Sequence, residues 1–269
     1  MQSKIVLITG GSSGIGKAMG QYLTAKGYVV YGTTRNLEKY PDFNDFVLLQ
    51  MDVTVPGTID RAVKEIVDRE GRLDVLVNNA GVGITGPLEE TPNDEILKAF
   101  KTNFNGPLNV IKAVLPQMRS QKNGLIINIT SIAGYMGLPF RGVYSASKGA
   151  LELAIESLRM ETKDFGIHLT CIAPGDFATN IAAGRYHAPV LEGSPYETSY
   201  GRTLKAIDED VDNGGDPIMV AKKVYSIINT KNPKIHYKVG SFLQKFSIVL
   251  KRILPDKWYE KLLLNYSDS

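Results

Sequence analysis

The sequence is poor in the residues that build disulfides and metal sites. Its 269 residues include one cysteine, Cys171, and three histidines. One cysteine cannot form an internal disulfide, and so few thiol and imidazole groups leave little material for a zinc site. A chain of this length buries enough apolar surface to fold without such cross-links. We therefore expect no metal and a reducing, intracellular setting.

Long hydrophobic runs are also missing. No stretch reaches the roughly 18 uninterrupted apolar residues that suggest a membrane-spanning helix. A strand-like run starts at Lys4, which leaves no room for the charged and apolar regions of a secretory signal peptide. These absences predict a cytoplasmic protein, with any membrane association confined to its surface.

The chain has little net charge, and the small excess lies at one end. Lys and Arg total 31 against 28 Asp and Glu, a net charge of +3. From His236 onward there are six basic and three acidic residues, so this segment carries the whole excess. A basic tail fits an anionic partner such as a membrane surface, or only a solvated helix face. Elsewhere the basic residues form no stripe interleaved with aromatics, which argues against nucleic-acid binding.

Short apolar runs alternate with segments of helical periodicity through most of the chain. Continuous apolar runs predict strands buried on both faces at residues 4–9, 28–34, 46–51, 73–78, 125–131 and 167–173, with a short strand at 235–239. Helices are expected at 15–26, 58–70, 94–121, 144–164 and 217–229. This alternation predicts an α/β fold with a parallel sheet and right-handed crossovers in a single domain.

We divide the chain into a catalytic domain at 1–240 and an amphipathic helical tail at 241–269. The strand–helix rhythm stops between 176 and 216, and a long segment without clear elements is typical of a lid or a mobile loop. In 241–254 the apolar residues recur at helical spacing, and Trp258 and Tyr259 continue the pattern beyond Pro255. Such a tail either packs on the domain or a partner subunit, or rests in a membrane interface.

The first predicted strand passes into the first helix through a glycine-rich turn. The turn reads TGGSSGIG, and the residues expected to face a ligand are Gly10, Ser12, Ser13, Gly14, Ile15 and Gly16. A turn in this place points backbone N–H groups and a helix N-terminus at a pyrophosphate. Its spacing is G-x-x-x-G-x-G rather than G-x-G-x-x-G, and such turns also occur for purely geometric reasons.

The tip of the second strand carries Thr34 and Arg35, and no acid. Folds that bind NAD usually place an acid there, which accepts from the ribose hydroxyls. A guanidinium can instead hold a 2′-phosphate through charge-assisted hydrogen bonds, each worth about 1.5–3 kcal/mol. We therefore predict NADP(H), unless Arg35 is an ordinary surface arginine. Asp52 and Val53 follow the third strand and are expected beside the adenine, although Asp52 equally suits a cap or turn.

Tyr144 and Lys148 open a predicted helix at i, i+4 spacing, which places the phenol and the ammonium on one face. A free phenol ionises only near pH ~10, and a cation within about 4–6 Å favours the phenolate. Tyr144 is then the proton donor to a carbonyl or the acceptor from an alcohol. Lys148 is also expected to contact a nicotinamide ribose. A lone Y-x-x-x-K is a weak signal, because it occurs on many helix surfaces.

Ser131 strengthens this interpretation, because it closes a strand at the carboxyl edge where α/β sheets bind ligands. Its hydroxyl is expected to orient the substrate oxygen, and Thr130 is the rival. Asn103 falls inside the helix predicted at 94–121, where asparagine is a poor helix former. It either holds a water that passes protons to Lys148 or makes a structural hydrogen bond to a neighbouring strand.

Asn79, Ala80 and Gly81 follow the fourth predicted strand. They are expected to pack under the adenine and ribose of a dinucleotide, or to stabilise the central sheet. Both roles are compatible.

Together these segments resemble the short-chain dehydrogenase/reductase family over roughly residues 4–229. The resemblance rests on motifs in the family's order and spacing: Thr9–Gly16, Asn78–Gly81, Asn103, Ser131, Tyr144–Lys148 and Pro174–Gly175. It implies a doubly wound seven-strand Rossmann sheet with a flexible substrate lid after Gly175. It also implies that Pro174, Gly175 and Thr179 bind the nicotinamide end of the cofactor. A homodimer or homotetramer through 94–121 and 144–164 is expected by the same resemblance.

Two stretches, 134–140 and 86–90, are similar to the hydroxysteroid and retinol dehydrogenase branch, and 10–17 resembles ketosphinganine reductases. These branches act on large apolar carbonyls or alcohols. We expect an NADP(H)-dependent oxidoreductase that interconverts a carbonyl and a secondary alcohol on an apolar substrate: a steroid, a retinoid or a long-chain keto lipid. A small carbonyl substrate stays open. The alternative from another class is a dinucleotide-binding sensor or scaffold, which needs only the glycine turn.

Overall fold

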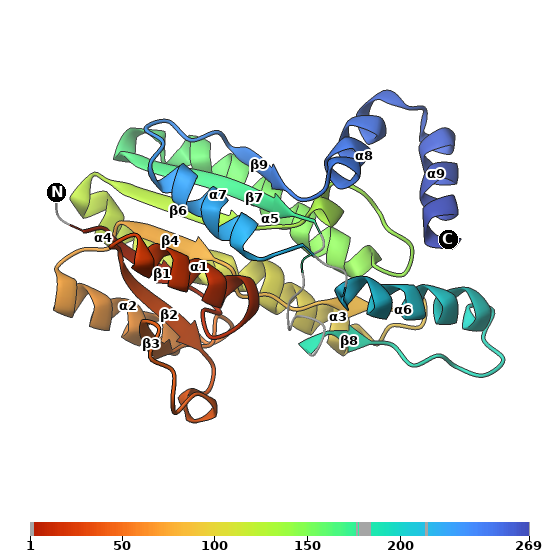
Figure 1. Cartoon of the computed structure of the whole chain (residues 1–269), viewed down its shortest axis with the longest axis horizontal. Coiled ribbons are helices and arrows are strands. Elements are labelled where there is room, and N and C mark those ends of the chain that lie inside the picture. The colour runs from red at the N-terminus through yellow and green to blue at the C-terminus, as the bar shows by residue number, and fades with distance from the viewer. Residues whose placement is uncertain (1–2, 176, 178–183, 213–214, 269) are drawn as a thin grey trace.

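The computed structural model describes residues 3–175, 177, 184–212 and 215–268. Seven parallel strands form one sheet in the order β3-β2-β1-β4-β6-β7-β9 (Figure 1). Their bounds are β1 Ile5–Ile8, β2 Val29–Thr34, β3 Val47–Gln50, β4 Val75–Asn78, β6 Gly124–Ile129, β7 Ile167–Pro174 and β9 His236–Val239. The strand order runs outward in both directions from β1 and β4, which confirms the predicted doubly wound sheet in a single domain.

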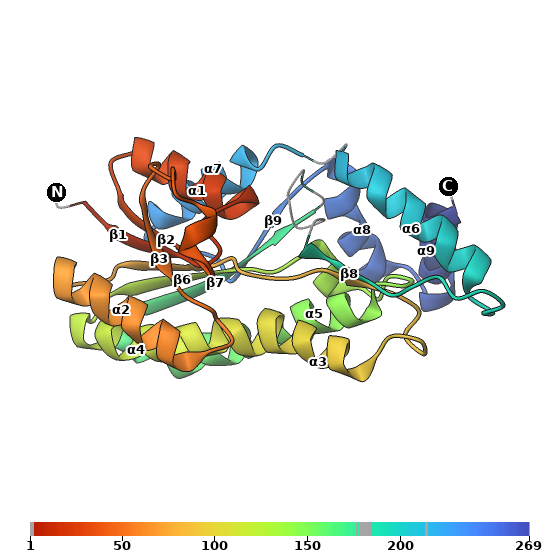
Figure 2. The same ribbon diagram turned by 90° about the horizontal axis from the view of Figure 1, so that it is seen from below.

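Helices cover both faces of the sheet, so its central strands are buried throughout (Figure 2). α1 (Gly14–Ala25) and α7 (Ile218–Ile228) lie on one face. α2 (Pro56–Glu70), α4 (Gly106–Gln121) and α5 (Gly142–Glu161) lie on the other. Each face has its own apolar core, one around Met19 and Val224 and one around Ile66 and Val114. This burial explains why the strands read as continuous apolar runs.

The prediction of a single helix at 94–121 is wrong, because the structure divides this segment into three parts. α3 (Asn93–Phe100) and α4 are separated by η2 (Lys101–Asn105), a π-helical turn. The Gly106 N–H donates to the Lys101 carbonyl in this turn. Single π turns within a helix are frequent at functional sites, and this one holds Asn103, which is fully buried.

The segment predicted to lack clear elements, 176–216, contains two. β8 (Tyr186–His187) pairs with β5 (Ile84–Thr85) in a separate small sheet, and α6 (Glu197–Asp212) follows it. Sequence patterning missed α6 because it is mostly polar. One aromatic anchors it instead, since buried Tyr200 donates its hydroxyl to the Ala188 carbonyl at 2.8 Å.

Two helices, α8 (Phe242–Ile253) and α9 (Asp256–Asp268), lie on either side of Pro255. α8 begins with a capping box between Ser241 and Gln244. Short 3₁₀ turns complete the secondary structure at η1 (Leu37–Lys39), η3 (Ile132–Tyr135) and η4 (Lys163–Phe165). Within the described residues, no helix combines the length and apolar character that crossing a bilayer requires.

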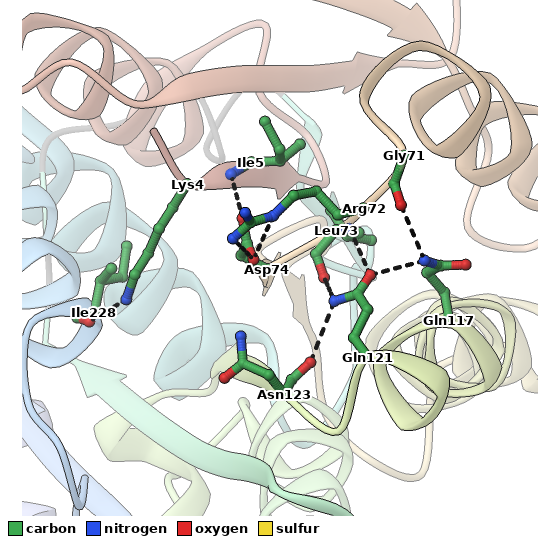
Figure 3. A network of polar contacts seen from close by, with 10 residues as sticks. All are labelled: Lys4, Ile5, Gly71, Arg72, Leu73, Asp74, Gln117, Gln121, Asn123 and Ile228. Atoms are coloured by element: carbon green, nitrogen blue, oxygen red, sulfur yellow. Dashed lines mark hydrogen bonds and ion pairs between the residues drawn. The ribbon is translucent and has the colours of Figure 1, made fainter. Parts of the chain in front are cut away.

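The amino edge of the sheet is closed by a network of polar contacts (Figure 3). The buried Asp74 carboxylate accepts from the Ile5 N–H at 2.8 Å and from Arg72 Nε at 3.0 Å. The Gln121 amide meets both backbone groups of Leu73, each at 3.0 Å. These bonds fix the starts of β1 and β4 and satisfy the buried polar groups at this edge. Ligands of parallel α/β sheets bind at the opposite, carboxyl edge.

Candidate active site

A cleft of about 560 Å³ opens at the carboxyl edge of the sheet. Its walls come from the turn after β1, the tips of β2, β3 and β4, and α3. Most of the cofactor-binding residues predicted from the sequence line it: Gly10, Ser12, Ser13, Gly14, Ile15, Thr34, Arg35, Asp52, Val53, Asn79, Ala80 and Gly81.

The glycine turn has the backbone that its sequence requires. Gly10 and Gly14 have φ angles of +66° and +51°, a region that glycine enters without steric cost. Ser13 stands at the N-cap of α1 and makes no side-chain capping bond, so a ligand can meet the first-turn N–H groups. Gly16 supports the turn from behind, since a side chain there would collide with the Gly10 carbonyl.

The segment after β4 holds this turn in place. Asn79 Nδ2 donates to the carbonyls of Thr9 and Gly10, at 3.0 and 3.2 Å. The Thr9 hydroxyl accepts from the N–H groups of Asn79 and Ala80. Asn78 Nδ2 points into the sheet and donates to Asn128 Oδ1 at 3.0 Å. Neighbouring asparagines therefore divide the two roles, one under the turn and one in the central sheet.

The residues expected to select the cofactor lie at the cleft rim. Arg35 is exposed there, with no acid at the tip of β2. Asp52 Oδ1 accepts from both the N–H and the hydroxyl of Thr54, so it is a turn residue that also lines the cleft. Lys17 pairs with Asp45 at 3.1 Å, which directs its ammonium to that carboxylate.

Sequence reasoning missed one wall of the cleft. Residues from α3, η2 and β8 line it, including Glu95, Lys98, Lys101 and Tyr186. No motif marks these residues. Tyr186 reaches the cleft because β8 pairs with β5 beside the site, a contact between segments about a hundred residues apart. Only the three-dimensional fold reveals that contact.

The predicted catalytic pair lies on α5 as expected. Lys148 is buried, and its Nζ lies 5.9 Å from the centre of the Tyr144 ring. The same Nζ donates to the Ile129 carbonyl at 3.0 Å, at the end of β6 and two residues before Ser131. The guanidinium carbon of Arg141 lies 5.8 Å from the Tyr144 ring centre. Two cations therefore lie near the half-buried Tyr144 ring.

The neighbouring hydroxyls are used differently. Thr130 is buried and donates to Glu152 Oε1 at 2.6 Å, so its proton is committed away from the site. Ser131 is half-buried at the N-cap of η3, where its oxygen accepts from the Ala133 N–H at 3.1 Å. Its hydroxyl proton takes no part in that bond. This arrangement favours Ser131 over Thr130 as the hydroxyl that orients a substrate oxygen.

The Asn103 side chain makes structural hydrogen bonds. Its amide exchanges two hydrogen bonds with the Val82 backbone, each at 2.9 Å, and donates to Ser147 Oγ at 3.2 Å. A β-carbon at Gly81 would lie 3.2 Å from Asn103 Oδ1 and 3.3 Å from Lys148 Nζ. Gly81 also lines the cleft. Absence of a side chain at Gly81 therefore lets the cleft wall approach both predicted catalytic groups.

The remaining predicted residues lie outside the cleft lining. Gly16, Tyr144, Lys148, Pro174 and Gly175 are not among the described residues that line it. Pro174 ends β7, and the Gly175 N–H donates to the Val239 carbonyl at 2.7 Å. Thr179 lies outside the described residues.

Burial suppresses the acidity of two nearby groups. Burial raises the pKa of the Cys171 thiol well above its usual range, with smaller contributions from Glu152 and Glu156. Burial and the adjacent Glu152 raise the pKa of the Tyr135 phenol in the same way. Cys171 is therefore a packed thiol rather than a nucleophile.

Comparison with known proteins places the chain in a family. The short chain dehydrogenase family model matches residues 4–189. The chain is 40% identical over 264 residues to 3-ketodihydrosphingosine reductase of Bacteroides thetaiotaomicron, covering 98% of this chain and 97% of that protein. It is 34% identical to NADPH-dependent 3-dehydrocapnine reductase of Ornithobacterium rhinotracheale, covering 96% and 95%.

A solved structure at a similar level of sequence identity has the same fold. ElxO with NADP bound is 29% identical, covers 89% of this chain and 97% of its own, and gives a TM-score of 0.72. The family model covers more than half of the chain, and the sheet order is that of a doubly wound fold. The chain belongs to the short-chain dehydrogenase/reductase family, and is an oxidoreductase of that family.

Proposed function

We propose that this protein is an NADP(H)-dependent reductase that converts the ketone of a long-chain, lipid-like substrate to a secondary alcohol. The observation that carries the proposal is the position of Lys148, between Tyr144, the Ile129 carbonyl and Gly81 of the cleft wall. A cation in that place would serve the phenol, and it lies behind the cleft wall at Gly81.

The residues of the cleft fit a phosphorylated dinucleotide. Gly10, Ser13 and Gly14 would hold the pyrophosphate at the N-terminus of α1. Arg35 would hold a 2′-phosphate, and no acid at the tip of β2 would repel it. Two relatives support this choice, since one is named NADPH-dependent and ElxO was solved with NADP. Bound NADPH supplies the hydride of the reaction.

The chain's own groups complete the reduction. The carbonyl carbon gains the hydride, and the oxygen gains a proton from the Tyr144 hydroxyl. Ser131 holds that oxygen by donating its hydroxyl proton. Lys148 places a positive charge beside the Tyr144 ring. Asn103 holds η2 against the backbone of Val82, in the segment between β4 and β5. The phenolate regains a proton from solvent, which restores the starting state.

The substrate class rests on two kinds of support. The name of the Bacteroides relative identifies a reductase of a keto sphingoid base, which is a long-chain 3-keto amine. In this chain, Phe140, Tyr196 and Tyr200 form an aromatic cluster. The ring centroid of Tyr196 lies 6.4 Å from that of Phe140, and the ring centroid of Tyr200 lies 5.3 Å from it. This cluster joins the loop before Tyr144 to α6, and it would suit an apolar chain. A domain at 1–240 with its substrate lid at about 176–216 remains part of this proposal.

Tyr144→Phe tests the catalytic assignment. We expect loss of about 10²–10⁴-fold in the rate of NADPH oxidation with 3-ketosphinganine, because the phenolic proton is removed. NADPH binding, followed by quenching of protein fluorescence, should stay within about twofold of wild type. Tyr22→Phe, at a tyrosine of α1 that packs on Tyr225 and lies outside the cleft lining, serves as the matched control and should keep its turnover. A Tyr144→Phe enzyme with undiminished turnover would refute the assignment, and a wild type that binds NADPH but reduces no ketone would indicate a sensor.

We also propose a homodimer or homotetramer through α4 and α5. Leu153 and Met160 on α5 are both 68% exposed, and their seven-residue spacing places them on one face of the helix. Large apolar residues in such a row are typical of a protein–protein contact.

A further inference from the structure

The C-terminal helices turn large apolar side chains toward solvent. On α8, Phe242, Phe246 and Ile253 are 74%, 42% and 72% exposed. Their spacing of four and seven residues places them in one row along the helix. Trp258 on α9 is 71% exposed, and Leu262 is 40% exposed one turn later. We call these five residues the outer stripe.

A different face of the same helices packs on the domain. Ile248 of α8 and Tyr259 of α9 are 1% and 2% exposed. They form a buried cluster with Ile132, Met136 and Ala173. The outer stripe therefore contributes little to folding, although packing on the domain was one reading of the tail's apolar pattern. Exposed apolar rows of this kind mark a surface for another body.

The charge around the outer stripe indicates what kind of partner this surface suits. Lys245, Arg252, Lys257 and Lys261 are exposed beside it. Lys251 is directed elsewhere, 3.7 Å from Asp256 and 5.2 Å from the Tyr259 ring centre. An apolar row with a tryptophan, flanked by lysine and arginine, suits the headgroup region of an anionic bilayer. A second copy of the tail would instead bring like charges face to face.

The packed face of α8 lies next to segments that adjoin the predicted catalytic residues. Gln244 of α8 contacts Gly175 at the end of β7, and Ile132 and Met136 belong to the segment that follows Ser131. Figures 1 and 2 show α8 and α9 at the same end of the molecule as α6 and β8, far from α2 and β3. A surface that contacts α8 and α9 therefore lies at the same end of the molecule as α6.

We propose that α8 and α9 dock the protein on an anionic lipid bilayer through the outer stripe and its flanking cations. Docking holds the substrate side of the molecule against the phase in which a long-chain ketone dissolves. The docking itself is independent of the proposed reaction, and only the delivery of substrate rests on it.

Sedimentation of the full chain with vesicles tests the docking. Wild type should bind vesicles of phosphatidylcholine and phosphatidylglycerol better than vesicles of phosphatidylcholine alone. Phe242→Ser with Phe246→Ser should weaken binding at least about tenfold, because two aromatic side chains no longer enter the interface. Lys245→Gln with Arg252→Gln should weaken binding about tenfold on the anionic vesicles alone. Met219→Ser, which removes an exposed apolar residue from α7, is the matched control and should bind as wild type does.

The outcomes separate docking from catalysis. No binding of wild type to anionic vesicles overturns the proposal. A wild-type dimer that the phenylalanine variant dissociates, with vesicle binding unchanged, overturns it too and assigns the stripe to a second copy. All variants should reduce a short water-soluble ketone at the wild-type rate. If wild type binds vesicles but reduces no ketone, the proposed function fails and the docking stands.

Discussion

At the scale of single residues, the site depends on side chains that are committed and side chains that are available. The Thr130 hydroxyl donates a hydrogen bond to Glu152, whereas the Ser131 oxygen only accepts one in capping η3. Lys17 is paired with Asp45, whereas Arg35 is exposed at the cleft rim. Residue type and sequence position do not separate these neighbours, because hydrogen bonding to distant partners decides which group can meet a ligand.

Arg35 is therefore predicted to set the preference between cofactors. Arg35→Ala should raise KM for NADPH about tenfold to 100-fold, because one or two charge-assisted hydrogen bonds to the 2′-phosphate are lost. KM for NADH should change little. Initial rates with each cofactor measure the effect. Lys17→Ala is the matched control, since its ammonium is held by Asp45, and an equal effect in both variants would contradict the role of Arg35.

At the scale of elements, one polar cluster ties the edge strand β9 to α5. His236 lies between two carboxylates, with Nδ1 3.1 Å from Glu152 and Nε2 2.9 Å from Glu156. Glu152 is buried and also accepts from Thr130 at the end of β6. Two strands and α5 thus share one buried carboxylate, which holds the helix against the sheet.

His236→Ala should lower the free energy of unfolding by about 1–3 kcal/mol, because buried Glu152 loses a partner. Urea unfolding followed by circular dichroism measures this change. Glu156→Ala, which removes the more exposed carboxylate, should cost less than about 1 kcal/mol. Equal losses for the two variants would show that burial of Glu152 is not the cause.

Elements also show where sequence patterning succeeds and where it fails. The strands and α5 were predictable because their apolar runs and the Tyr144–Lys148 spacing are local. The turn at η2 was not, because a single π turn adds one residue within a helical segment and no residue type marks where it occurs. α6 was missed because one buried tyrosine anchors it. Tyr186 in the cleft wall was missed because strand pairing between distant segments places it there.

At the scale of the whole molecule, we propose different partners for two exposed apolar surfaces, one on α5 and one on the C-terminal helices. α5 presents Leu153 and Met160, and the tail presents the outer stripe at the end of the molecule with α6. An oligomer through α5 would leave both tails available to one bilayer only if they project to the same side. The oligomer and the docking surface are therefore best tested separately.

Leu153→Glu with Met160→Glu should convert the oligomer to a monomer, because charges at the centre of an apolar contact are desolvated without partners. Light scattering coupled to size-exclusion chromatography gives the mass. Leu88→Glu, at a residue that is 66% exposed, is the matched control and should keep the wild-type mass. A monomeric wild type would contradict the proposed assembly.

The polar closure at the amino edge of the sheet has a consequence for how the protein can vary. Asp74, Arg72 and Gln121 secure β1 and β4 at the end opposite the cleft. Changes in this closure alter how long the folded chain survives, while changes at the cleft alter what it reacts with. Selection for persistence and selection for chemistry thus act on opposite ends of the same strands. New substrate preferences can accumulate at one end without eroding the other.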